Sequence, residues 1–180
     1  MKTAVLVIDM QQGLCVGPSA AHDCAGTIER INSVIRQART AGVPVIFVQH
    51  ESGPGYLEHG SPAWQLAAGL EVEPSDERVR KTSPDAFLRT ELQPLIERQG
   101  IRQLVICGMH TEFCVDTTTR RALALGYPVI LVADGHTTAG NEALSPQQVI
   151  SHHNATLTNI SSFGPRVQAV RAIEIQLATA

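Results

Sequence analysis

The sequence has 180 residues, of which 43% are hydrophobic, and a formal net charge of −3. A chain of this length fits a single domain spanning residues 1–180. Seventeen acidic residues against fourteen basic ones argue against a nucleic-acid-binding surface. No apolar run approaches the ~20 residues needed to cross a bilayer. We therefore expect neither nucleic acid nor a membrane as a partner.

The chain contains four cysteines, Cys15, Cys24, Cys107 and Cys114. This number is too small for a disulfide scaffold, and reduced thiols are typical of cytosolic proteins. The first residues show no hydrophobic stretch of signal-peptide length and no small-residue cleavage site. The sequence therefore predicts a cytoplasmic protein.

Short apolar runs alternate with amphipathic segments along the chain. Runs rich in β-branched residues predict strands at residues 4–8, 43–48, 104–107 and 129–132. Apolar residues at helical spacing predict helices at 28–38, 88–96 and 115–125, each followed by a glycine, and more weakly at 146–157 and 166–177. The segment Glu51–Pro84 is rich in glycine and proline and lacks a long periodic stretch, which predicts a long functional loop.

Strands that alternate with helices predict a three-layer α/β/α fold with a mostly parallel central sheet. In such sheets ligands bind outside the carboxyl ends of the strands, where the strand order switches. Polar residues follow each predicted strand, at Asp9–Gln11, Gln49–His50, Gly108–Cys114 and Asp134–His136. We therefore expect the functional site at this edge of the sheet.

The stretch Gly108–Val115 reads Gly-Met-His-Thr-Glu-Phe-Cys-Val and leads from a buried strand into a helix. A cysteine at a helix start is exposed to the positive end of the helix dipole, which favours the reactive thiolate. Cys114 is therefore a candidate nucleophile. The alternative is that Cys114 is a small buried hydrophobic residue, as free cysteines often are.

Two charged residues could assist a cysteine at this edge. Asp9 directly follows an apolar strand. Desolvating a carboxylate there is costly unless it is paired or has a functional role. Lys81 ends the long segment Glu51–Pro84. The alternatives are that Asp9 caps a turn and that Lys81 is a solvated surface charge.

Taken together, these motifs resemble the isochorismatase-like cysteine hydrolases. The resemblance covers about the whole chain and rests on four blocks in the family's order: Val7–Gln11, Lys81–Phe87, Gly108–Val115 and Leu131–Asp134. It implies a Rossmann-like fold and an Asp–Lys–Cys triad, in which Asp9 is the general base, Lys81 its cationic partner and Cys114 the nucleophile. It also implies a cis peptide between Met109 and His110, with the N–H groups of His110 and Cys114 forming an oxyanion hole.

The resemblance implies hydrolysis of the C–N bond of a small amide or lactam through a thioester. One alternative is isochorismate-type cleavage of a vinyl ether, which has no evident need for a thiol. Another is a non-catalytic or thiol-redox protein. The chain has no GxGxxG after its first strand, and Cys107, which we expect to face into the sheet, forms no CxxC pair with Cys114.

Related nicotinamidases carry an aspartate two positions before the histidine that corresponds to His50, and this chain does not. His50, Glu51 and His59 could in principle gather around zinc, but we expect neither metal nor cofactor. Trp64 could cover substrate, lie at a subunit interface or pack in the core. The residues expected to contact the small-molecule substrate are Gln11, His50, Tyr56, Trp64 and Phe113. Family members often form homodimers or larger homo-oligomers, and the long loop of one subunit could reach its neighbour.

Overall fold

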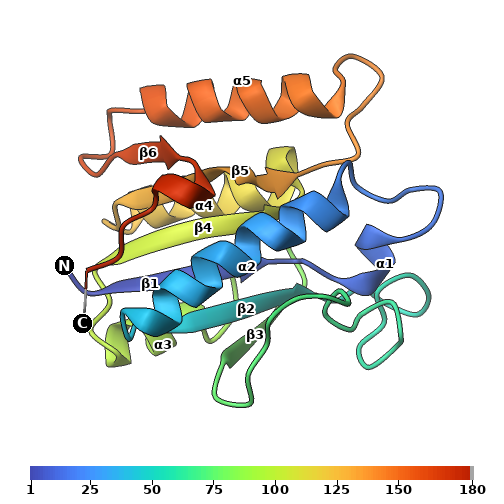
Figure 1. Cartoon of the computed structure of the whole chain (residues 1–180), viewed down its shortest axis with the longest axis horizontal. Coiled ribbons are helices and arrows are strands. Elements are labelled where there is room, and N and C mark those ends of the chain that lie inside the picture. Colours follow the sequence, from blue (N-terminus) through green and yellow to red (C-terminus); the bar gives the residue numbers. More distant parts are fainter. Residues whose placement is uncertain (179–180) are drawn as a thin grey trace.

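The computed structural model describes residues 1–178, which form a six-stranded parallel sheet covered by helices on both faces (Figure 1). The strand order is β3-β2-β1-β4-β5-β6. The strands are β1 Thr3–Ile8, β2 Val45–His50, β3 Glu77–Lys81, β4 Gln103–Met109, β5 Val129–Thr137 and β6 Val167–Val170. The predicted three-layer architecture is confirmed, and every pairing in the sheet is parallel.

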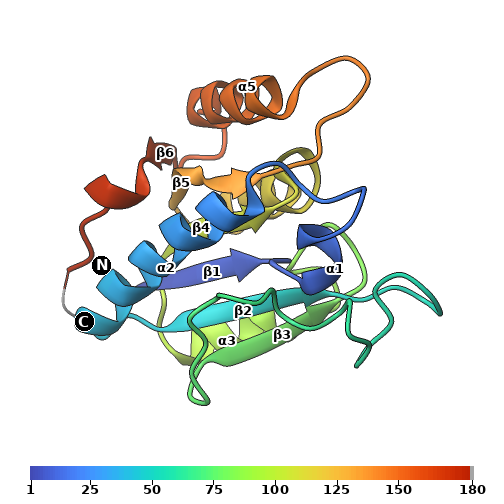
Figure 2. The same ribbon diagram turned by 45° about the vertical axis from the view of Figure 1, so that its right-hand side comes forward.

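The helical elements divide between the two faces of the sheet (Figure 2). On one face lie α2 and the short η2, and on the other lie α3, α4 and α5. The helical elements are α1 Gln12–Cys15, α2 Cys24–Thr40, α3 Leu92–Arg98, η1 Thr111–Val115, α4 Asp116–Ala124, α5 Pro146–Asn159 and η2 Ala172–Glu174. No helix among residues 1–178 is both long enough and apolar enough to span a membrane.

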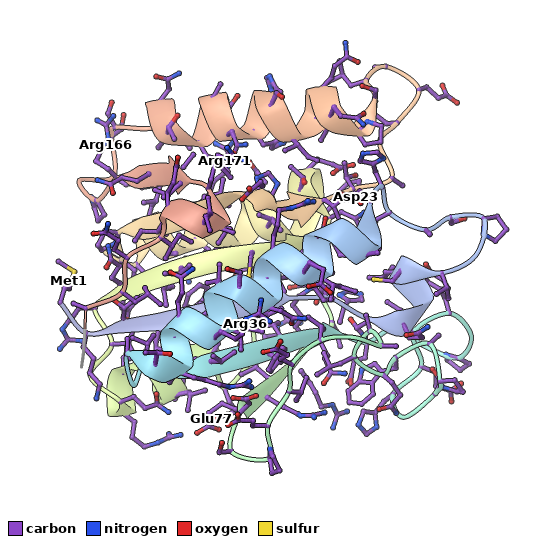
Figure 3. All side chains as sticks on the ribbon, viewed as in Figure 1. Met1, Asp23, Arg36, Glu77, Arg166 and Arg171 are labelled. Atoms are coloured by element: carbon purple, nitrogen blue, oxygen red, sulfur yellow. The ribbon has the colours of Figure 1, made fainter. Side chains whose placement is uncertain are left out.

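The apolar runs form strands because both faces of the sheet are covered. In β1, Leu6 and Ile8 pack toward α3 and α4, while Val5 and Val7 pack toward α2. Strands buried on both sides are hydrophobic at every position. Figure 3 shows side chains filling both layers, whereas the labelled Arg36, Glu77 and Arg166 lie outside and are exposed.

The central strands end at the same edge of the sheet. The strand order switches at β1, because β2 and β3 lie on one side of it and β4, β5 and β6 on the other. β1 pairs with β2 on one side and with β4 on the other, and Ile8 lies opposite both Val48 and Gly108. Gly108 has a φ of +119°, and a Cβ there would lie 2.0 Å from the Ile8 carbonyl oxygen. Only glycine therefore allows β4 to approach β1 at the strand-order switch.

Two sequence-based expectations are wrong. The segment 51–84, expected as a loop, contains the edge strand β3, and its charged Glu77–Lys81 pattern hid the strand because an edge strand has no need of a continuous apolar run. Residues 166–177, expected as a helix, form β6 and η2. In addition, Leu88 lies before α3, which begins at Leu92. The assignment of residues 1–180 to one domain stays a prediction.

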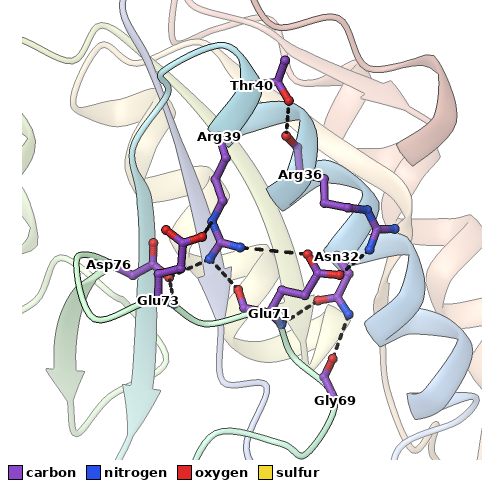
Figure 4. A network of polar contacts seen from close by, with 8 residues as sticks. All are labelled: Asn32, Arg36, Arg39, Thr40, Gly69, Glu71, Glu73 and Asp76. Atoms are coloured by element: carbon purple, nitrogen blue, oxygen red, sulfur yellow. Dashed lines mark hydrogen bonds and ion pairs between the residues drawn. The ribbon is translucent and has the colours of Figure 1, made fainter.

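The middle of the long segment is tied to α2 by a polar network (Figure 4). The Arg39 guanidinium donates to the Glu71 carbonyl oxygen at 2.7 Å and to the Asp76 carboxylate at 3.0 Å. Asn32 donates to the Gly69 carbonyl oxygen at 2.8 Å and accepts from the Glu71 N–H at 3.0 Å. These bonds hold the connection that leads into β3 and thereby fix where Lys81 lies.

Candidate active site

Asp9 and Lys81 form a buried ion pair at the carboxyl edge of the sheet. The Lys81 Nζ lies 2.7 Å from Asp9 Oδ2, and the side chains are 0% and 2% exposed, respectively. Lys81 is the last residue of β3, and Asp9 follows β1 with a φ of +51°. A buried charge pair of this kind is costly to desolvate, so both groups need further partners.

The Lys81 ammonium has three further neighbours. It lies 3.2 Å from Cys114 Sγ and 3.2 Å from His50 Nδ1, and it donates to the Ser83 carbonyl oxygen at 3.1 Å. Residues far apart in the sequence thus meet because the ends of β1, β2, β3 and β4 converge on the same edge. The alternative that Lys81 is a solvated surface charge is wrong, because its side chain is 0% exposed.

Cys114 lies within η1, a single π-helical turn that precedes α4. Burial is the main cause that raises the pKa of Cys114 to about 12; the Asp9 charge adds to it and Lys81 opposes it. The thiol is therefore protonated at neutral pH, although its position at a helix start favours the thiolate. A base must take its proton during reaction. Asp9 Oδ1 is buried and accepts no hydrogen bond from residues 1–178.

Alkylation of Cys114 by iodoacetamide should keep accelerating above pH 9, by about tenfold per pH unit, because only the thiolate reacts. An ordinary thiol instead levels off near a pKa of about 8.5. Peptide mass spectrometry measures the rate at Cys114 separately from the other three cysteines. A plateau at or below pH 9 would contradict the raised pKa.

His50 and Gln11 differ in what they can offer a substrate. His50 lies beside Lys81, and burial followed by the Lys81 charge lowers the pKa of its imidazole. Gln11 is fully buried; its amide donates to the carbonyl oxygens of His50 and Trp64, both at 2.9 Å, and accepts from the His50 N–H at 2.8 Å. These bonds tie Gln11 to the end of β2 and to the segment that carries Trp64. Contact of Gln11 and His50 with substrate stays a prediction.

Tyr56, Trp64 and Phe113, which are expected to contact substrate, differ in burial. Trp64 is buried and packs edge-on against His59, with ring centroids 4.7 Å apart. Tyr56 and Phe113 are 55% and 56% exposed, and the Tyr56 hydroxyl donates to the Gly13 carbonyl oxygen at 3.0 Å. Their contact with substrate stays a prediction.

The turn between β4 and η1 has the geometry that the resemblance implies. The peptide between Met109 and His110 is cis. Met109 is fully buried, and burial lowers the pKa of the His110 imidazole. The backbone N–H groups of Phe113 and Val115 both donate to the His110 carbonyl oxygen, at 3.1 and 3.2 Å. The oxyanion-hole role of His110 and Cys114 stays a prediction.

The site contains one set of metal-type donors among residues 1–178. Asp9, His50 and Cys114 each offer one donor atom, and these atoms lie within 4.8 Å of one another. All three already contact the Lys81 ammonium, so the lysine supplies the cation at this place. The alternative set of His50, Glu51 and His59 does not gather: Glu51 binds Arg80, and His59 packs against Trp64.

Sequence reasoning missed Thr118, which braces the loop after Lys81. Its hydroxyl donates to the Pro84 carbonyl oxygen at 3.3 Å and accepts from the Ala86 N–H at 3.1 Å. Thr118 lies on α4, one helical turn after Cys114. We expected a helix face here but no polar role, and no sequence signal distinguishes such a threonine from one that merely packs.

The parallel α/β sheet places an aspartate, a lysine and a cysteine together at its strand-order switch, which is the arrangement that the resemblance to the isochorismatase-like cysteine hydrolases implies. The chain belongs to the isochorismatase family, since residues 3–162 match its Isochorismatase domain. The sequence resemblance is therefore confirmed. A solved structure described as an isochorismatase family protein shares 35% identity and a TM-score of 0.85, covering 93% of this chain and 98% of that one.

The relatives with named activities include a streptothricin hydrolase and a ureidoacrylate amidohydrolase. The streptothricin hydrolase of Streptomyces noursei is 37% identical over 136 residues, which cover 75% of this chain and 49% of the relative. The ureidoacrylate amidohydrolase RutB of Methylobacterium radiotolerans is 30% identical over 212 residues, covering 97% of this chain and 79% of the relative. The chain thus spans about half the length of the streptothricin hydrolases that it matches.

Proposed function

We propose that the protein hydrolyses the C–N bond of a small amide or lactam, with Cys114 as nucleophile, Asp9 as general base and Lys81 as their cationic partner. The observation that carries the proposal is the Lys81 ammonium, 2.7 Å from Asp9 Oδ2 and 3.2 Å from Cys114 Sγ. The names of the relatives, a streptothricin hydrolase and an amidohydrolase, support amide hydrolysis.

The first half of the reaction forms a thioester. Asp9 accepts the Sγ proton while the sulfur attacks the substrate carbonyl, and the former carbonyl oxygen becomes an oxyanion. Two N–H groups, of His110 and Cys114, donate to this oxyanion; one such donor typically contributes about 3–4 kcal/mol of barrier lowering. The intermediate then collapses: the C–N bond breaks, and Asp9 returns the proton to the departing nitrogen.

The second half releases the acid. A water molecule attacks the thioester carbonyl and gives a proton to Asp9. The C–S bond breaks, and Asp9 passes that proton to Cys114, which regenerates the thiol. The unpartnered Asp9 Oδ1 supports this role, because a carboxylate oxygen that accepts no hydrogen bond from residues 1–178 is free to take a proton from sulfur or from water.

The presence of Cys114 supports amide hydrolysis over vinyl-ether cleavage and thiol-redox chemistry. Vinyl-ether cleavage needs an acid that protonates carbon and has no evident use for a nucleophilic sulfur. For thiol-redox chemistry, Cys114 would need a second thiol nearby. Cys107 instead packs in the core on the α2 face of the sheet, whereas Cys114 packs against the core on the opposite face.

A panel of small amides, lactams and isochorismate, assayed with the wild type and with Cys114→Ala, tests the proposal. At least one amide or lactam should be hydrolysed, and Cys114→Ala should lower kcat by at least about a thousandfold, since acyl transfer loses its nucleophile. Cys24→Ala is the matched control, because Cys24 lies at the start of α2 and contacts none of the three residues. Activity on isochorismate alone, or near-wild-type turnover by Cys114→Ala, would contradict the proposal.

We also infer that the protein acts in the cytoplasm as a homodimer or higher homo-oligomer. The four cysteines are free thiols in this structure. Tyr56 and Phe113 are large, exposed side chains, and Phe113 adjoins Cys114. A neighbouring subunit that covered them would also enclose the substrate.

A further inference from the structure

A chain of buried polar contacts lies behind the turn that carries Cys114. The Thr111 hydroxyl lies 2.9 Å from His136 Nδ1, and His136 Nε2 lies 3.0 Å from Asn154 Oδ1. The Asn154 amide in turn donates to the Ala133 carbonyl oxygen at 2.9 Å. Thr111 is 0% exposed and His136 is 2% exposed. These contacts join η1 to β5 and α5.

Each bond in the chain has only one possible direction while His136 is neutral. The Ala133 carbonyl oxygen can only accept, so the NH₂ group of Asn154 faces it and the Asn154 oxygen faces His136. That oxygen needs a donor, so the imidazole proton is on Nε2. Nδ1 is then an acceptor, and the Thr111 hydroxyl donates to it.

Thr111 is the first residue of η1, and no side chain caps this turn. The side chain of Thr111 is instead directed at His136 on β5. A second hydrogen bond also connects η1 to the residues around the end of β5: the Thr138 hydroxyl donates to the Glu112 carboxylate at 2.7 Å. The start of the turn that carries Cys114 is therefore anchored by residues at the end of β5 and just beyond it.

We propose that His136 is a positioning residue for the hydrolytic reaction: its Nδ1 holds Thr111, and thereby fixes η1 so that Cys114 and the His110 N–H face the substrate carbonyl. This inference rests on the proposed function. It assigns a role to a histidine that touches neither substrate nor the reacting atoms. Small displacements of a nucleophile cost a large factor in rate, which is why such an anchor matters.

The surroundings of His136 keep it neutral. The charged or titratable groups that act on it are Asp134 on its own strand and His153 on α5. Burial is the main cause that lowers the pKa of His136 to about 4. Its folded pKa lies below the ordinary value of about 6.5, so the stability it contributes is present above pH 6.5 and is lost as the pH falls toward 4. Protonation would also place a hydrogen on Nδ1 and leave the Thr111 hydroxyl without its acceptor.

Thr111→Val tests the anchor, because it keeps the shape of the side chain and removes the donor. We expect kcat to fall about 10- to 100-fold with little change in KM, and Thr111→Ser to restore most of it. Thr119→Val is the matched control, since the Thr119 hydroxyl is also fully buried but has no partner among residues 1–178. His136→Asn can still accept from Thr111, so it should retain more activity than His136→Gln, which reaches only toward Asn154.

Two measurements test the positioning role of His136 independently of whether the protein hydrolyses an amide. In ¹⁵N NMR of histidine-labelled protein, the His136 signals, assigned through their loss in His136→Gln, should report a neutral imidazole protonated at Nε2 at pH 7. The alkylation rate of Cys114 should change in Thr111→Val but not in Thr119→Val, whether or not any amide is a substrate. A His136 protonated at Nδ1, or kcat and alkylation rates in Thr111→Val within about twofold of the Thr119→Val values, would overturn the inference.

Discussion

Lys81→Met should destabilise the fold by about 3–5 kcal/mol, because it leaves the Asp9 carboxylate buried with no cation beside it. It should also abolish hydrolysis. Urea denaturation measures the loss of stability. Lys2→Met is the matched control, since Lys2 is the only other lysine of the sequence and is exposed; its effect should stay within about 0.5 kcal/mol.

The double variant Asp9→Asn/Lys81→Met distinguishes two effects: the loss of folding stability caused by one unpaired buried charge, and the loss of hydrolysis caused by removing the ion pair. With both charges removed, most of the lost stability should return, because replacing a buried ion pair by neutral groups is often nearly neutral. Hydrolysis should stay absent, because the base is gone. If the double variant were as unstable as the sum of the two single variants, the pair would not be the coupled unit that its 2.7 Å contact indicates.

Asp9→Asn should raise the alkylation rate of Cys114 and lower kcat. The Asp9 charge helps to raise the pKa of Cys114 and Lys81 lowers it, so the pKa of the thiol should fall in the variant. Alkylation at pH 7 should accelerate by about tenfold for each pH unit of that fall. In contrast, kcat should drop by about 10²- to 10⁴-fold, because the variant loses the carboxylate that is proposed to move protons to the leaving nitrogen and from water.

Asp116→Asn is the control for the two opposite effects expected of Asp9→Asn on alkylation rate and kcat. Asp116 lies only two residues after Cys114, but its carboxylate binds the Arg120 guanidinium at 2.8 and 3.0 Å. Removing this charge should alter neither the alkylation rate nor kcat. Slower alkylation in Asp9→Asn would mean that Asp9 favours the thiolate in the resting protein, contrary to its effect on the pKa of Cys114.

The sequence pattern located the central strands and the edge at which they end. Continuous apolar runs such as Ala4–Ile8 form strands that are covered on both faces, which is the situation that produces such runs. Asp9 and Cys114 were predictable for the same reason, since each follows a strand or turn whose position the pattern identifies. The family's ordered blocks added Lys81 and the cis peptide between Met109 and His110.

Local pattern failed where tertiary contacts decide the structure. β3 pairs with β2 along one side only, and its Glu77–Lys81 sequence is too charged to be read as a strand. The segment that forms β6 contains a helix-like spacing of apolar residues, but pairing with β5 makes it a strand. In both cases backbone hydrogen bonds to a neighbouring strand outweigh the propensity of a short segment.

By itself the sequence determined a parallel α/β fold, the place of its functional edge and the residue types gathered there, because covered strands and the residues that follow them leave a periodic signal. Only the tertiary structure decided the protonation of Cys114, the enclosure of Lys81 by Asp9, His50 and Cys114, and the His136 anchor. These features depend on burial and on distances between side chains from different strands and helices, and no spacing along a single chain segment encodes either.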